Sequence, residues 1–216
     1  MANLPDPFVL IASLALLALA PFIAIMTTSF VKIVVVMSLV RNALGVQQIP
    51  PNMAVNGLAI ILSIYIMAPV GFATYDRVGQ NPPSLADTAA IKTTLTEGAE
   101  PLRQFLLKHS NERERQFFID SAAGLWPEEQ QKYAAADSFL VLLPSFTVSE
   151  LNRAFEIGFL LYLPFVAIDL IVSNILLAMG MMMVSPMTIS LPFKLLLFVL
   201  LDGWTRLIHG LVLSYQ

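Results

Sequence analysis

Several charged residues lie inside segments that are otherwise apolar, and these residues have the clearest chemical requirement in the sequence. A charge at the depth of a lipid bilayer is costly unless it finds a partner. Asp202 and Arg206 are four residues apart, a spacing at which two side chains on one helix can form an ion pair. Lys194 lies about 12 Å along the same axis from Asp202, too far to share that carboxylate. Lys194 therefore needs another partner.

Two candidate partners for Lys194 are present in the sequence. Arg153 is flanked three residues away on each side by Glu150 and Glu156, so this triplet carries one excess negative charge. The triplet could meet Lys194 from another helix or from a neighbouring subunit, and Asp169 is the competing partner. We hypothesise that these charges specify packing between subunits or helices. The alternative is that they pair at the lipid interface, which long side chains reach by extending toward water.

Five of the ten methionines fall between residues 179 and 187. Met181, Met182 and Met183 are adjacent, and because each helical residue turns by about 100° from the last, their side chains cannot share one helix face. Gly180 before them and Pro186 after them permit a bend in which several thioethers project toward one space. Flexible methionines from several copies could form a ring that deforms around a moving polypeptide. The alternative, which residue properties alone favour, is a methionine-rich apolar core.

The sequence lacks motifs for catalysis, metal binding and nucleic-acid binding. No Walker loop, G-x-S-x-G or H-E-x-x-H motif occurs, and a chain without cysteine has no disulfide and no thiolate site. A membrane-embedded hydrolase would need a base near Ser145 or Ser185, and neither serine has a histidine nearby in the sequence. The net charge of −3 leaves no basic surface for nucleic acid. We expect no enzyme activity, no cofactor, no metal and no nucleic-acid partner.

Apolar helices are the elements that must position these residues. The chain is 57% hydrophobic and only 12% charged, and most of its charged residues lie between residues 76 and 137. Outside that region there are four apolar blocks, each near or above the ~20 residues that cross a bilayer: residues 8–40, 53–74, 157–184 and 191–215. The sequence therefore predicts an all-α membrane protein with about four apolar segments.

Prolines and charges interrupt these blocks. Pro21 and Lys32 lie in the first block, Pro69 ends the second, and Pro164 interrupts the third. Because backbone groups and charges in hydrocarbon must find partners within protein, we expect the helices to face one another or other subunits. The predicted organisation has three parts. An N-terminal apolar hairpin (residues 1–75) is followed by a polar helical insert (76–138) and a C-terminal apolar hairpin with a methionine-rich bend (139–216).

Local signals predict one further helix start and the orientation of the chain. Thr147 to Glu150 has the spacing of a capping box and predicts a helix start that leads into the third block. Lys32 and Arg41 lie beside the loop at residues 42–52, which contains no acidic residue. This positive bias favours a cytoplasmic loop, which would place the insert and both termini on the periplasmic side.

Three stretches are distinctive enough to carry a family resemblance. They contain Thr28-Ser29-Phe30-Val31-Lys32 with Arg41-Asn42-Ala43-Leu44-Gly45-Val46-Gln47-Gln48-Ile49-Pro50-Pro51-Asn52, then Pro144-Ser145-Phe146-Thr147-Val148-Ser149-Glu150-Leu151, and finally Met179-Gly180-Met181-Met182-Met183 with Leu191-Pro192-Phe193-Lys194-Leu195 and Asp202-Gly203-Trp204. Together they resemble the FliP/SctR family of type III export-gate proteins. The resemblance covers both ends of the chain, and only the polar insert lacks a distinctive motif.

The resemblance implies both an architecture and a role. Members of this family form a homopentameric ring that assembles with S-type and T-type subunits, beside other export-apparatus membrane components, in the bacterial inner membrane. Their apolar segments form bent helical hairpins, and the assembled gate projects toward the periplasm. The family's methionine-lined constriction maps onto Met181, Met182 and Met183, which favours the ring over the core. Such a gate passes unfolded protein substrates, with energy supplied by other components.

Two further expectations concern the branch of the family and the rival function. Flagellar members often begin with a cleavable leader, whereas this chain starts seven residues before its first apolar block, so the injectisome branch is favoured. The rival function is a small-solute membrane channel or transporter, a class that also uses broken helices and charges near the membrane midplane. That class predicts inverted internal repeats, and the sequence shows none.

Overall fold

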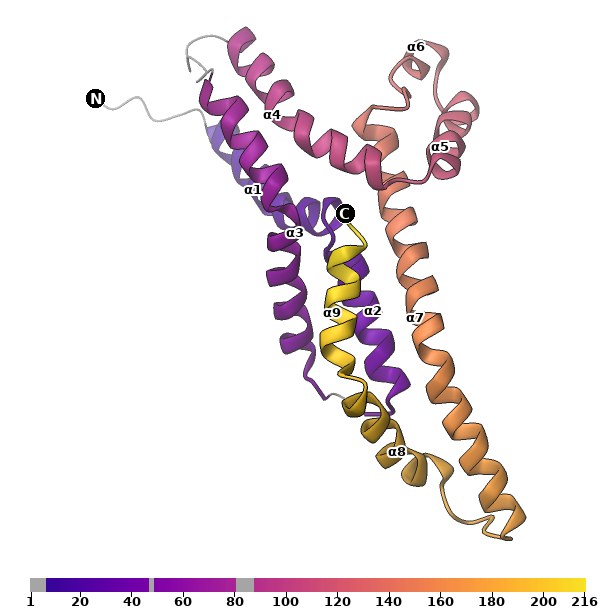
Figure 1. Ribbon diagram of the computed structural model, residues 1–216. Coiled ribbons are helices and arrows are strands. Elements are labelled where there is room, and N and C mark those ends of the chain that lie inside the picture. Colours follow the sequence, from indigo (N-terminus) through magenta and orange to yellow (C-terminus); the bar gives the residue numbers. More distant parts are fainter. Residues whose placement is uncertain (1–6, 47–48, 81–87) are drawn as a thin grey trace.

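The computed structural model describes residues 7–46, 49–80 and 88–216. Within these residues every regular element is helical and no strand is present, which confirms the prediction of an all-α protein. The helices from the two ends of the chain pack together, and the helices of the central insert extend from one end of this group (Figure 1).

The N-terminal group consists of α1 (Pro7–Thr27), α2 (Phe30–Ala43) and α3 (Asn52–Gln80). The first apolar block is therefore two helices and not one, with a bend of 63° between them. At the end of α1 the hydroxyls of Thr27 and Thr28 donate hydrogen bonds to the carbonyl oxygens of Ile23 and Ala24. Side-chain bonds of this kind compete with the backbone ladder and favour a break in the helix.

The C-terminal group consists of α7 (Phe139–Ala178), α8 (Pro186–Leu200) and α9 (Gly203–Leu213). The bend between α8 and α9 is 59°. At a rise of ~1.5 Å per residue, the 40 residues of α7 extend over ~60 Å, about twice the ~30 Å hydrocarbon core of a bilayer. A large part of α7 must therefore lie outside the hydrocarbon if the helix crosses it steeply.

The insert consists of α4 (Thr88–His109), α5 (Glu112–Leu125) and the short α6 (Glu128–Gln131). These helices pack against the first turns of α7 through two small apolar clusters, one around Leu106 and Phe146 and one around Ala122 and Val141. α3 ends at Gln80 and α7 begins at Phe139, and the division of the chain at residues 75 and 138 stays a prediction.

The main core is built around α2. Its residues Ile33, Val36, Met37 and Val40 are buried at helical spacing and pack against residues of α3, α7 and α9. On α7, Gly158 allows α2 to come close, because a Cβ atom at that position would lie 2.3 Å from Cδ1 of Leu39. A helix that is buried on most sides in this way is positioned by packing rather than by its caps.

Proline does not end the helices in the way the sequence predicts. α3 continues through Pro69 to Gln80, and α7 continues through Pro144 and Pro164. In apolar surroundings, neighbouring helices and hydroxyl side chains can satisfy the backbone groups that a proline leaves free, so the helix persists. The predicted interruption of the second and third blocks at these prolines is wrong.

The predicted helix start at Thr147–Glu150 is also wrong, because these residues lie in the interior of α7. The Thr147 hydroxyl donates to the Leu143 carbonyl at 2.8 Å, and the Ser149 hydroxyl donates to the Ser145 carbonyl at 2.6 Å. Serine and threonine in a helix can bond to the carbonyl four residues earlier, so their presence at capping-box spacing does not require a helix end.

Two helices are long and apolar enough to cross a membrane, Asn52–Gly79 and Phe139–Ala178, and each bent pair could supply one more span. This agrees with the prediction of about four apolar segments in bent hairpins. The end of α2, the start of α3 and the α7–α8 turn lie toward one end of the molecule, and the insert lies at the other end of α7 (Figure 1).

Candidate functional site: the methionine turn and the Glu150 cluster

The methionines lie in a turn between α7 and α8. Gly180 has a left-handed backbone with a φ of 73°, which glycine adopts without steric cost. The Met181 amide donates to the Leu176 carbonyl at 2.9 Å and so closes the end of α7. α8 then begins at Pro186, a residue that is favoured in a first helical turn. The structure thus has the bend that Gly180 and Pro186 predict, and we call residues 179–185 the methionine turn.

The side chains of the methionine turn are exposed. The exposed fraction is 42% for Met181, 81% for Met182 and 101% for Met183, and Met179 is exposed as well. The interpretation of these residues as a core within one chain is therefore wrong. The turn lies at the end of the molecule opposite α4–α6 (Figure 1), where flexible apolar side chains are available to another chain.

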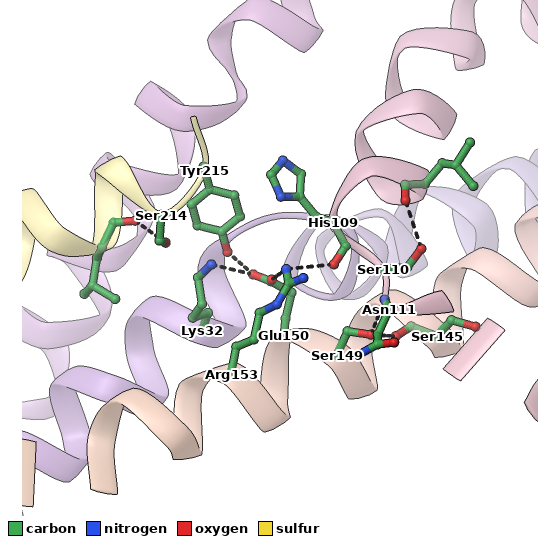
Figure 2. Close-up of polar contacts among 12 residues, drawn as sticks. Lys32, His109, Ser110, Asn111, Ser145, Ser149, Glu150, Arg153, Ser214 and Tyr215 are labelled. Atoms are coloured by element: carbon green, nitrogen blue, oxygen red, sulfur yellow. Dashed lines mark hydrogen bonds and ion pairs between the residues drawn. The ribbon is translucent and has the colours of Figure 1, made fainter. Parts of the chain in front are cut away.

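A second group of candidate residues surrounds the carboxylate of Glu150 on α7 (Figure 2). This carboxylate accepts a hydrogen bond from the Tyr215 hydroxyl. Its oxygens lie 3.3 Å from Lys32 Nζ and 3.3 Å from Arg153 Nη1. The side chains of Glu150 and Lys32 are 0% and 1% exposed. We call Lys32, Glu150, Arg153 and Tyr215 the Glu150 cluster, and it joins α2, α7 and the segment after α9.

Aromatic contacts tie α4 to the same centre. Lys32 Nζ lies 3.5 Å from the centroid of the Tyr215 ring, a cation–π contact. The Tyr215 ring stacks on Phe105 at 6.1 Å and lies 5.1 Å from the His109 ring. Arg153 donates a hydrogen bond to the His109 carbonyl oxygen at 2.9 Å. Four elements that are far apart in the sequence therefore meet at one buried point.

The electrostatics of this point favour a neutral histidine. Burial lowers the pKa of the His109 imidazole from 6.5 to about 4, and the positive charges of Lys108, Lys32 and Arg153 act in the same direction. The ring is therefore uncharged near neutral pH and packs as an aromatic group between Phe105 and Tyr215. A protonated ring would add a further positive charge to a buried cluster that already holds two.

The corner between α4 and α5 is fixed next to this cluster. The Asn111 amide donates to the Ser149 hydroxyl at 2.8 Å, and the Asn111 side chain accepts from the Arg113 amide at 2.9 Å as the N-cap of α5. Substituting such a cap typically costs about 1 kcal/mol. The Ser149 hydroxyl thus positions the insert and also donates a hydrogen bond to a carbonyl oxygen of its own helix.

Lys194 pairs with Asp169, one of its two candidate partners. Its Nζ atom lies 2.6 Å from an Asp169 carboxylate oxygen and donates to the Ala43 carbonyl at 3.1 Å. The other Asp169 oxygen accepts from the Ser190 hydroxyl at 2.6 Å. A cation at the last carbonyls of α2 is favoured by the helix dipole. The predicted pairing of Lys194 with the Glu150 triplet within this chain is therefore wrong, because the Glu150 carboxylate forms its ion pair with Lys32 instead.

Three of the predicted pairing residues have no ion-pair partner among the residues that the structure describes. Asp202 and Arg206 do not pair, although they have the expected spacing. Asp202 is the N-cap of α9, and its carbonyl accepts a hydrogen bond from the Arg206 amide at 3.0 Å. Its backbone is left-handed with a φ of 51°, and the two side chains form no ion pair. Glu156 borders a cleft of about 420 Å³ with Lys108 and Arg153.

The role of Lys32 and Tyr215 was missed by reasoning from the sequence. Lys32 had a usable signal, because a lysine in an apolar block needs an acidic partner, and the Glu150 triplet has one acid in excess. Tyr215 had no such signal, because nothing in the sequence indicates that it contacts Glu150, which lies 65 residues earlier. Its place in the cluster follows only from the packing of α9 on α2.

Neither a cluster of metal ligands nor a free Ser145 hydroxyl is present among the described residues. No group of three or more histidine, aspartate or glutamate side chains is placed to hold a metal within the ranges that the structure covers. The Ser145 side chain is fully buried and its hydroxyl donates to the Val141 carbonyl at 2.6 Å. The hydroxyl of Ser145 therefore serves the helix and is not available to attack a substrate.

Comparison with known proteins gives a consistent result. Residues 13–211 match the model of the FliP family. The chain is 64% identical over 215 residues to the Yop proteins translocation protein R of Yersinia pestis, which covers 100% of this chain and 99% of the relative. It is 51% identical over 216 residues to the virulence protein YscR of Salmonella typhimurium, covering 99% of this chain and 100% of the relative. It is 49% identical over 209 residues to the hypersensitivity response secretion protein HrcR of Ralstonia nicotianae, covering 96% of each chain.

Proposed function

The chain belongs to the FliP family, and from this membership and the methionine turn we propose that it is the pore-forming core subunit of a type III export gate. The family is a structural component of a secretion apparatus and not an enzyme family. The relatives are named for translocation, secretion and virulence, which gives this chain a role in type III secretion as a membrane component.

The finer proposal concerns assembly and location. Five copies form a ring in the bacterial inner membrane, joined by S-type and T-type subunits, and the assembled gate projects toward the periplasm. The relatives that act in virulence favour an injectisome over a flagellum. Glu156 and Asp202, which have no ion-pair partner among the described residues of this chain, pair with neighbouring subunits. Unfolded protein substrates pass through the ring.

The observation that carries this proposal is the exposure of the methionine turn. Three adjacent exposed methionines at a turn gain burial only from lipid or from another chain, because apolar groups left in water gain nothing. Here Gly180 and Pro186 hold Met181, Met182 and Met183 outside the core at the end of the molecule. Several copies around one axis would bring these side chains together as a soft, narrow ring.

The apolar surface of the helices supports an assembly in which several copies pack together. Large apolar side chains on α3 and α7 remain exposed along most of each helix, including Tyr65, Phe72, Phe159 and Ile171. Prolines and charges in the same helices are unusual for anchors that contact lipid alone. Both features are expected of helices that contact lipid on one side and neighbouring subunits on the other.

Replacement of Met181, Met182 and Met183 by alanine tests the proposal. We expect the assembled apparatus to form in normal amounts, with increased leakage of ions through the resting gate and altered secretion. Met53→Ala is the matched control, since Met53 is 86% exposed on α3 and lies outside the turn. Loss of assembly in the triple variant would contradict the proposal and would show that the methionines serve packing. Solute flux through the chain alone in liposomes would favour the small-solute channel instead.

A further inference from the structure

An apolar cleft of about 380 Å³ lies between α2, α7, α8 and α9, and none of its lining residues belongs to the methionine turn or to the Glu150 cluster. Its walls are formed almost entirely by apolar side chains, among them Val40, Leu161, Phe165, Phe198 and Leu207. The volume falls in the range of sites for small molecules, ~300–1,000 Å³. A helix with its side chains is ~10 Å wide, so the cleft suits a thinner occupant.

Arg206 is the charged residue in the lining of this cleft. The other cations of α2, α7 and α8 all have partners: Lys32 and Arg153 pair with Glu150, Lys194 pairs with Asp169, and Arg41 donates to Asn52 and Pro50. Within the part of the chain that the structure describes, the Arg206 guanidinium has no hydrogen bond or ion pair. Asp202, the nearest acid in the sequence, is not among the lining residues.

Arg206 lies on the first turn of α9, close to the bend between α8 and α9. Val40 on the last turn of α2 lines the cleft together with Arg206, so the cleft reaches the polar end of α2. Both Gly203 and Leu211 line the cleft, so it follows α9 for eight residues, ~12 Å. α9 runs away from the last turn of α2 (Figure 1). A cation at the polar end of an apolar channel is complementary to a molecule with one anionic head and a long apolar tail.

We propose that this cleft binds an anionic phospholipid, with one acyl chain between α7 and α9 and the headgroup phosphate on Arg206. Arginine recognises phosphate through a planar fork of donors, and a flexible acyl chain adapts to a cleft formed by side chains from four helices. The site lies within one chain and does not depend on the formation of a pore, so the two proposals can fail separately.

Trp204 provides the measurement, because its ring packs against the cleft residue Phe198 with 5.4 Å between centroids. In a Trp126→Phe background Trp204 is the remaining tryptophan of the full chain. The protein is reconstituted in bilayers that contain increasing fractions of brominated phosphatidylglycerol or brominated phosphatidylcholine, which quench tryptophan on contact. We expect a preference of about fivefold for phosphatidylglycerol, as for one cation beside anionic lipid.

Two pairs of variants separate a site from general contact with lipid. Arg206→Gln should abolish the preference and Arg206→Lys should retain it. Gly210→Leu should reduce quenching by both lipids, because Gly210 lines the cleft and an added Cβ there meets nothing within 4 Å. Gly57→Leu, equally unobstructed on α3, should change nothing. Equal quenching by the two lipids, or no effect of Gly210→Leu, would overturn the proposal. An absence of quenching by either lipid would show that a second copy covers the cleft, and would overturn it too.

Discussion

The candidate functional side chains at the two ends of α7 differ in burial. Toward its start, Glu150 is buried and holds Lys32, Arg153 and Tyr215 as partners from the same chain. At its end, the methionine turn projects side chains that are largely exposed, above all Met182 and Met183. The first region has its partners within one chain, whereas in the proposed gate the second gains its contacts from neighbouring subunits. Substitutions in the Glu150 cluster should therefore reduce stability, and substitutions in the turn should alter transport.

The largest effect is expected from Glu150→Ala. This change leaves Lys32 buried with only the Tyr215 ring, and removal of one partner of a buried ion pair typically costs about 3–5 kcal/mol. The free energy of unfolding in detergent measures it. Glu112→Ala, on the surface of α5, is the control and should stay within about 0.5 kcal/mol. Equal effects at the two positions would mean that the cluster does not stabilise the fold.

A smaller loss is expected when Asp169 is replaced by alanine. Lys194 would then keep only the Ala43 carbonyl, and an under-satisfied buried cation costs about 2 to 3 kcal/mol. The swapped double variant Asp169→Lys with Lys194→Asp should recover part of the folded yield that either single reversal loses. Recovery by a swap of Lys194 with Glu156 instead would show that the pairing occurs between subunits.

The close approach of α2 to α7 should make Gly158→Ala destabilising by about 1–3 kcal/mol, the usual range for overpacking. An added Cβ atom would lie 3.1 Å from Leu39 Cβ as well as close to its Cδ1 atom. Gly57→Ala has open space around the new atom and should stabilise α3 slightly. Thermal unfolding of the two variants compares them directly, and the same direction of change in both would contradict the packing described here.

A pH effect follows from His109. Its pKa in the folded chain is about 4, below the ordinary 6.5, so the unfolded chain binds more protons between these values. The contribution of this group to stability is therefore complete above about pH 6.5 and is lost as the pH falls toward 4. His109→Gln should flatten the rise in stability over this interval, whereas His209→Gln should not. An unchanged slope in His109→Gln would show that the ring is not buried as a neutral group.

Helical content, the number of apolar segments and the bend at the methionines could be predicted because each depends on local sequence. Gly180 and Pro186 determine the bend almost independently of the surroundings. The partner of Lys194 could not be predicted, since Asp169 and Glu150 offer equivalent carboxylates and only packing distinguishes them. The false start at Thr147 has a similar cause, because its hydroxyl can serve either a cap or the helix interior.

The smallest effect on stability, and the most direct test of the pore, is expected at Met182. The chain has no cysteine, so Met182→Cys introduces a single thiol at an exposed position with little effect on the fold. In the assembled apparatus we expect cross-links between copies of the subunit through this thiol, and to a cysteine-bearing substrate arrested during export. Met53→Cys, equally exposed on α3, should give no cross-link to substrate. Cross-linking to substrate from Met53→Cys and not from Met182→Cys would contradict a pore lined by the methionine turn.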